Sequence, residues 1–157
     1  MKTKKLTLTA FINHSNIPPR LIRAVVNQLG GFEEFQQAAQ DITNHGISGG
    51  FGGFIYYTDT VAFSKKHKAD IMTLAEDQAR DYYGKDADAF QMIAGFNCLK
   101  GQELSPGQIA KLIHGREPKT GDAADDYTQL FNALAWYAGE EVARAWCDFV
   151  EYQNENQ

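Results

Sequence analysis

Two apolar stripes near the C-terminus constrain the fold most strongly, because both repeat at the spacing of an α-helix. The stripes are Tyr127, Leu130, Phe131, Leu134 and Ala138, and then Val142, Ala145, Trp146, Phe149 and Val150. Steps of three and four residues place apolar side chains on one helix face. Gly139 lies between the stripes and predicts a break, so we expect two helices here that form the main core.

The remainder of the chain shows shorter helical patterns separated by proline and glycine. A first stripe follows Pro18-Pro19 and stops at Gly30-Gly31, and a second helix is expected from Phe32 to about Asn44. Further helices are predicted from about Asp59 to Gly84 with a bend around residues 65–68, around Phe90, after Ser105-Pro106, and beyond a polar loop at Gly115–Asp126. The predicted fold class is mostly α: a single compact domain, residues 1–157, of six or seven short helices.

The N-terminal residues 1–13 are basic at first and then alternate between two sets of side chains. Leu6, Leu8, Ala10 and Ile12 alternate with Thr7, Thr9, Phe11 and Asn13. Alternation with a period of two is typical of a half-buried strand. This segment is therefore expected to be a short strand or a flexible arm.

A glycine-rich stretch, Asn44–Phe63, has a composition that ordinary packing does not explain. Its glycines are Gly46, Gly49, Gly50, Gly52 and Gly53. Glycine opposes order unless the backbone needs unusual dihedral angles or a close approach, so a structural loop is predicted. The next four residues, Phe54-Ile55-Tyr56-Tyr57, favour one small β element, and Asp59 is expected to cap the helix that follows.

The same stretch is the best place for a small-molecule or phosphate site, which is the enzyme alternative. No Gly-Lys-Ser/Thr follows the glycines, and G-x-G-x-x-G would require a preceding strand where a helix is expected. His45, Asp59 and His67 match no zinc signature. With no complete catalytic constellation in the sequence, we expect a non-enzymatic protein with no cofactor, no metal and no catalytic residue.

Charge is distributed unevenly along the chain, and this distribution bears on the partner. The net charge is −5, and the negative excess falls in residues 79–157. This excess disfavours direct nucleic-acid binding, which rests on phosphate neutralisation. It favours a protein partner with a basic surface. Asp122, Asp125 and Asp126 on the polar loop are the candidate contact residues, although capping of the next helix is an equal alternative for them.

Aromatic and basic side chains supply two further candidate surfaces. Tyr56 and Tyr57 are candidates for an exposed aromatic surface, together with Tyr82, Tyr83, Trp136 and Tyr137, because aromatic residues are enriched at interface hot spots. The segment 105–116 could be the second half of a helix-turn-helix, which makes a DNA-binding regulator another alternative. Glu140 is placed to pair with Arg144, and Glu140-Glu141 suit a helix start.

The sequence lacks the features of a secreted or membrane protein. Its two cysteines, Cys98 and Cys147, are too few for a disulfide framework and are expected to be buried thiols. There is no apolar run long enough for a transmembrane helix. The apolar part of the N-terminal segment is too short and too rich in threonine for a signal peptide. A cytoplasmic location in the host cell is expected.

Three segments carry a resemblance to a known family. The patterns NHG-x-x-GGF-x-GF-x-YY-x-DT-x-x-F, FNCLKG and NALAWYAGEEVARAW resemble small uncharacterised proteins of phages and other mobile elements. Small accessory proteins from such elements often inhibit host defence, including CRISPR effectors and restriction enzymes. The resemblance therefore implies a phage or mobile-element protein that binds a host protein, plausibly a defence nuclease.

Overall fold

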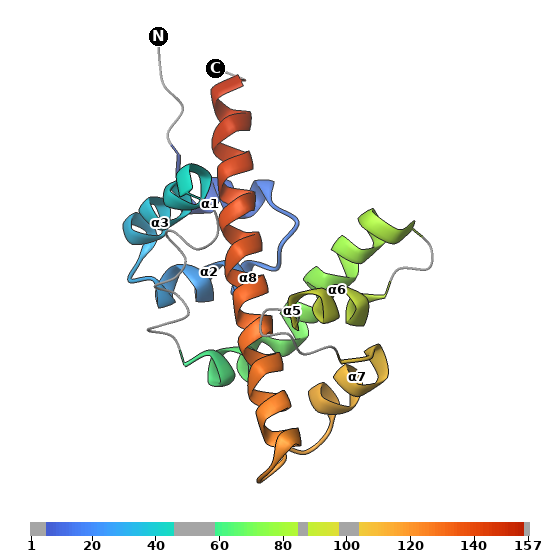
Figure 1. The fold of residues 1–157 in the computed structure, drawn as a ribbon. Helices are drawn as coiled ribbons and strands as arrows, with labels where there is room; N and C mark the ends of the chain where they lie inside the picture. Colours follow the sequence, from blue (N-terminus) through green and yellow to red (C-terminus); the bar gives the residue numbers. More distant parts are fainter. Residues whose placement is uncertain (1–5, 46–58, 85–87, 98–103, 156–157) are drawn as a thin grey trace. The chain divides into compact units, whose positions relative to one another are not determined.

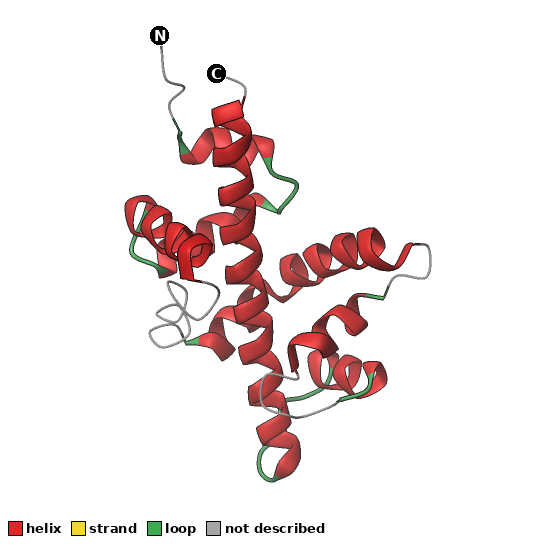
Figure 2. Ribbon diagram, turned by 45° about the horizontal axis from the view of Figure 1, so that its top comes forward, coloured by secondary structure: helices red, strands yellow, loops and turns green. Residues whose placement is uncertain are grey.

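The computed structural model describes residues 6–45, 59–84, 88–97 and 104–155. These residues form seven helices joined by loops (Figures 1 and 2). In chain order the helices are α1 (Leu8–His14), α2 (Pro19–Gln28), α3 (Phe32–His45), α5 (Thr60–Tyr83), α6 (Ala89–Asn97), α7 (Pro106–His114) and α8 (Asp122–Glu155). The predicted mostly α architecture is confirmed. The predicted small β element at residues 54–57 lies outside the described residues, as do the five glycines from Gly46 to Gly53.

The helices gather in two compact units. One unit comprises Met1–Thr58 with Ala138–Gln157, and the other comprises Asp59–Tyr137. Helix α8 contributes its residues up to Tyr137 to the second unit and those from Ala138 onward to the first. The expectation of one domain over residues 1–157 stays a prediction.

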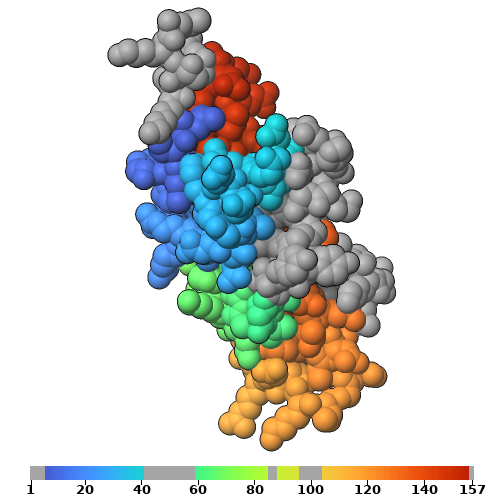
Figure 3. Space-filling view, turned by 90° about the vertical axis from the view of Figure 1, so that its left-hand side faces the viewer, coloured from blue at the N-terminus to red at the C-terminus, as the bar shows by residue number. Residues whose placement is uncertain are grey.

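In the first unit, an aromatic cluster forms the core between the N-terminal helices and the C-terminal part of α8. Trp146 is only 4% exposed, and its ring meets those of Phe11 and Phe32 edge-on at centroid distances of 5.3 Å. Phe35 and Phe149 complete the cluster. Figure 3 shows the atoms of α1, α2 and α3 gathered beside the end of α8. Trp146 is thus a core residue, as the apolar stripe predicts.

Helix α1 corrects the expectation of a strand or arm from Leu8 onward, and residues 1–5 of the expected segment 1–13 lie outside the described residues. The Thr7 side chain accepts a hydrogen bond from the Ala10 amide at 3.0 Å, and this cap starts the helix. Phe11 is fully buried. Over so few residues, an alternating pattern also contains pairs at the helical spacing i, i+3, such as Leu8 and Phe11. Burial of the Phe11 side chain can therefore decide between a strand and a helix.

Proline and glycine set the limits of α2 and the start of α3, as predicted. Pro18 and Pro19 occupy the N-cap and first helical position of α2. After α2 the chain turns at Gly30 and Gly31, whose φ angles are +102° and +125°. Such angles are strained for residues with a Cβ atom, so the two glycines allow α2 and α3 to pack as a hairpin.

The second unit is built from α5, α6, α7 and the first part of α8. Near its start, α5 is tied to α8 by two side chains: Ser64 Oγ donates to the Phe131 carbonyl at 2.7 Å, and Thr60 Oγ1 donates to Asn132 Oδ1. Helix α6 packs on both α5 and α7. His67 has non-helical angles, φ −107° and ψ 16°, so the predicted bend around residues 65–68 is confirmed.

Helix α8 corrects the predicted break at Gly139, because it runs through this residue without interruption. Glycine costs about 1 kcal/mol relative to alanine inside a helix. The two apolar stripes are in phase across it, since Ala138 and Val142 are four residues apart and both fully buried. Burial on both sides therefore outweighs the local preference, and the expected helix pair is one helix.

The start of α8 corrects the predicted loop from Gly115 to Asp126. Gly121 turns the chain with a φ of +87°, and the helix begins at Asp122. The Gly121 carbonyl accepts hydrogen bonds from the amides of Ala124 and Asp125 at 3.0 and 3.3 Å. Asp122, Asp125 and Asp126 are therefore helical residues, and the first two lie in the first turn, where carboxylates interact well with the helix dipole.

Candidate functional site

The two most exposed large aromatic side chains of the described residues lie together at the C-terminal end of α5. Tyr82 is 75% exposed and Tyr83 is 54% exposed. Gly84 ends the helix directly after them with a φ of +75°. Other aromatic residues that the sequence offered as candidates differ, because Tyr137 is fully buried and Trp136 is half-buried.

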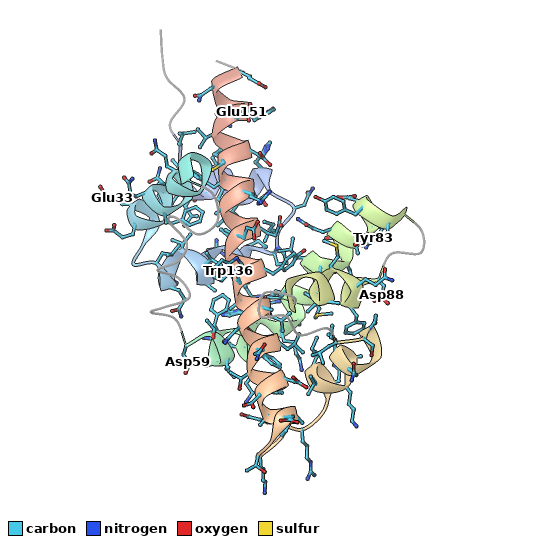
Figure 4. All side chains as sticks on the ribbon, in the orientation of Figure 1. Glu33, Asp59, Tyr83, Asp88, Trp136 and Glu151 are labelled. Carbon is cyan, nitrogen blue, oxygen red and sulfur yellow. The ribbon has the colours of Figure 1, made fainter. Side chains whose placement is uncertain are left out.

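Four carboxylates lie on the last turns of α5 and at the start of α6, near the same end of this helix pair as the tyrosines. Glu76 and Asp81 are exposed on the last turns of α5, and Asp77 is half-buried. Arg80 donates to Asp77 Oδ1 at 3.2 Å, a pair on the surface. Asp88 caps the start of α6, where its side chain accepts from the Phe90 amide at 2.9 Å. Figure 4 shows Tyr83 and Asp88 at the same end of the packed pair α5 and α6.

We call this surface the tyrosine–acid surface; its members are Glu76, Asp77, Arg80, Asp81, Tyr82, Tyr83 and Asp88. It combines two exposed rings with four carboxylates and one guanidinium. Rings and carboxylates together suit a partner that presents Lys or Arg side chains, because a cation can pair with a carboxylate and stack on an aromatic face. Sequence reasoning named Tyr82 and Tyr83 only within a larger list, since their exposure depends on tertiary packing.

The aspartates predicted as contact residues occupy a different place in the same unit. Asp122 and Asp125 are exposed and Asp126 is half-buried, all at the start of α8. Tyr56 and Tyr57, the other predicted contact residues, lie outside the described residues. The structure thus places the predicted aspartates on a helix rather than on a loop, and a role in stabilising that helix competes with a role in binding.

Two residues of the candidate enzyme site, Asp59 and His67, have structural positions in α5: Asp59 caps the helix and His67 lies at its kink. Asp59 caps α5, since its side chain accepts a hydrogen bond from the Ala62 amide at 3.0 Å. The His67 ring lies beside Phe63 at a centroid distance of 4.9 Å. The side chain of His45 lies outside the described residues. Among the side chains that the structure describes, no group of three His, Cys, Asp or Glu residues could hold a metal ion.

The segment 105–116 forms α7 and continues into a loop that contacts α5. Ser105 and Gln108 form a capping box at the start of α7. Lys68 Nζ donates to the Ile113 carbonyl at 3.0 Å, and Lys65 Nζ lies 2.7 Å from Glu117 Oε2. The hydrogen bond with Glu117 raises the pKa of the Lys65 ammonium above its ordinary value. No sequence pattern predicts these two contacts, which join residues 45 and 52 positions apart.

Glu140 pairs with Arg144 as its spacing predicts, but in the middle of α8 rather than at a helix start. The Arg144 guanidinium lies 2.6 Å from Glu140 Oε1. The Glu140 side chain is 5% exposed and the Arg144 side chain is 55% exposed. Among the described residues, Glu140 Oε2 is buried and has no hydrogen-bond partner. This carboxylate therefore depends on Arg144.

A groove of about 620 Å³ lies in the first unit between α3 and the last turns of α8. Gln36 and Gln40 line it from α3, and Trp146, Cys147 and Val150 line it from α8. The Cys147 thiol donates to the Ala39 carbonyl at 3.3 Å, which ties the two helices together. Cys147 is half-buried rather than fully buried, and Cys98 lies outside the described residues.

The described residues define a mostly α protein whose clearest surface feature is the tyrosine–acid surface. The chain belongs to the family described as Domain of unknown function (DUF7222), whose sequence profile matches residues 19–152. No curated protein and no solved structure matches the chain. None of the described helices has both the length and the apolar composition of a membrane span.

Proposed function

We propose that the chain is a non-enzymatic protein that acts by binding another protein through its tyrosine–acid surface. The observation that carries the proposal is the exposure of Tyr82 and Tyr83, at 75% and 54%, at consecutive positions at the end of α5. Tyrosine is enriched at interface hot spots, because it offers a large contact area with few rotatable bonds and a hydroxyl that forms hydrogen bonds.

The charge of the surface indicates the kind of partner. Glu76 and Asp81 are exposed on the last turns of α5, which the tyrosines end, and complementary charge on a partner raises the association rate and excludes wrong partners. A basic protein surface is therefore the expected counterpart. Nucleases present such surfaces because they hold the phosphates of nucleic acid.

The resemblance to mobile-element proteins makes this partner more specific. A protein of such an element that binds a nuclease of host defence would protect the element, as anti-CRISPR and anti-restriction proteins do. We propose that the chain is an inhibitor of this type, acting in the host cytoplasm. The absence of a complete catalytic signature in the sequence supports a binding role over an enzymatic one.

Affinity capture from host lysate with matched variants tests the proposal. The wild-type chain, the variant Tyr82→Ala/Tyr83→Ala, and the control Tyr152→Ala are immobilised and compared by quantitative mass spectrometry. Tyr152 is a suitable control because it is also exposed, at 46%, but belongs to the other unit. We expect a host protein that the wild type and the control retain and the double variant loses.

The retained protein is then tested for nuclease activity in the presence of the wild-type chain. Inhibition that the double variant lacks would support the defence-inhibitor proposal. Equal retention of the same proteins by all three baits would contradict binding through the tyrosine–acid surface. Captured proteins without nuclease activity would contradict the more specific part of the proposal and leave a binding role.

A further inference from the structure

Two basic segments far apart in the sequence are in contact on the second unit. The segments are residues 65–68 at the kink of α5 and residues 111–119 at the end of α7 and in the loop after it. Two contacts join them: Lys68 Nζ with the Ile113 carbonyl at 3.0 Å, and Lys65 Nζ with Glu117 Oε2 at 2.7 Å. We call the result the basic surface; its members are Lys65, Lys66, Lys68, Lys111, Arg116 and Lys119.

The kink of α5 lies within the basic surface. His67 adopts φ −107° and ψ 16°, angles that are sparsely populated and that interrupt the helix between Lys65 and Lys68. The two lysines on either side of His67 make the two contacts that join the segments.

Within the two segments little negative charge balances these cations, and the nearest further carboxylate on α5 is Asp70, four residues after Lys66. Glu117 is the one carboxylate within the two segments. Lys66, Lys111, Arg116 and Lys119 are exposed and form no ion pair among the described residues. The three aspartates at the start of α8 follow Lys119 in the chain. The chain as a whole carries −5, so this concentration of positive charge opposes the overall balance.

We propose that the basic surface binds the phosphate backbone of nucleic acid. The net charge of the chain argues against broad nucleic-acid binding, but contacts to phosphates depend on the local arrangement of Lys and Arg. Lys111 is exposed on α7, and Arg116 and Lys119 are exposed in the loop after it, so their cationic groups are accessible to phosphates. This function is separate from the proposed protein binding and does not depend on it.

Two other anionic partners fit the basic surface less well. An anionic membrane is bound by basic residues together with apolar side chains that enter the lipid. Here Ile113 is buried, and the exposed residues of the two segments are polar, charged or glycine. An acidic protein would be expected to use aromatic anchors. The exposed tyrosines lie instead at the other end of α5, about 22 Å from Lys68 at 1.5 Å per residue.

The test measures binding of a short fluorescent DNA duplex by anisotropy at several salt concentrations. If the four exposed cations without an ion pair among the described residues each contact one phosphate, the logarithm of the association constant should fall with the logarithm of the salt concentration with a slope of about −3.6. Affinity should therefore fall on the order of 100-fold when the salt concentration rises about fourfold. A single-stranded RNA of the same length is measured in parallel to show which nucleic acid is preferred.

Charge-reversal variants assign the binding to this surface. Lys111→Glu/Lys119→Glu removes two exposed cations that have no ion pair, and should reduce the affinity at low salt at least about tenfold and the slope by about 2. Arg20→Glu/Arg23→Glu changes the charge of the chain equally on α2, outside both the basic surface and the tyrosine–acid surface, and should bind almost as the wild type does. Thermal unfolding checks that both variants are folded.

Three results would overturn the proposal. The wild-type chain could fail to bind the duplex and the RNA at low salt. The control variant could lose as much affinity as the Lys111→Glu/Lys119→Glu variant, which would make the effect one of net charge. Poly-glutamate could bind as tightly and with the same slope as nucleic acid, which would assign the surface to acidic proteins.

Discussion

Asp59 determines where α5 begins. Its side chain accepts a hydrogen bond from the Ala62 amide at 3.0 Å, which satisfies one of the backbone donors that a helix start leaves unpaired. We expect Asp59→Ala to lower the free energy of unfolding by about 1 kcal/mol, as measured by urea denaturation. Asp59→Ser retains a capping oxygen and serves as the control. If the two variants were equally stable, the side chain would have no capping role.

Glu140 and Arg144 provide a second prediction at the scale of residues. Removal of Arg144 would leave the buried carboxylate without its ion pair, so Arg144→Ala should cost about 1–3 kcal/mol. An exposed pair contributes only about 0–1 kcal/mol. In a Glu140→Gln background the same change should cost less, because the uncharged amide does not need the cation. An equal cost in both backgrounds, measured by denaturation, would contradict the dependence.

Helix α8 shows what sequence reasoning could predict about an element and what it could not. Its apolar stripe, the cap at Asp59 and the turn at Gly30-Gly31 depend on neighbouring residues, and all three were predictable from the sequence. The continuity of α8 through Gly139 was not predictable from the sequence, because the local preference of glycine favours a break. Only the tertiary burial of both flanking segments makes the helix continuous.

A proline substitution tests the continuity of α8. Proline at position 139 would remove a backbone hydrogen bond and clash with the preceding turn, so Gly139→Pro should cost about 3 kcal/mol or more. Ala123→Pro is the matched control, because Ala123 lies in the first turn, where proline is tolerated. Thermal or urea unfolding measures both. If the Gly139→Pro variant were as stable as the Ala123→Pro variant, the result would support the break at Gly139 that the sequence predicts.

At the scale of the whole molecule, the functional surfaces were less predictable than the helices. The exposure of Tyr82 and the burial of Tyr137 follow from which helices pack on which, and the residue type says nothing about it. The basic surface was equally unpredictable from the sequence, because it joins Lys65 and Lys68 to residues 52 and 45 positions further along the chain. Helix α5 carries both surfaces, one at its kink and one at its end.

The central claim is that a partner protein covers the end of α5. Hydrogen exchange of the chain, measured with and without the protein retained in the capture experiment, tests this claim most directly. Amides in the last turn of a helix open locally and exchange quickly, so a bound partner slows them visibly. The account predicts slower exchange at residues 78–84 and 88–92, with no change in α2. Protection confined to other helices, with residues 78–84 exchanging as in the free chain, would contradict it.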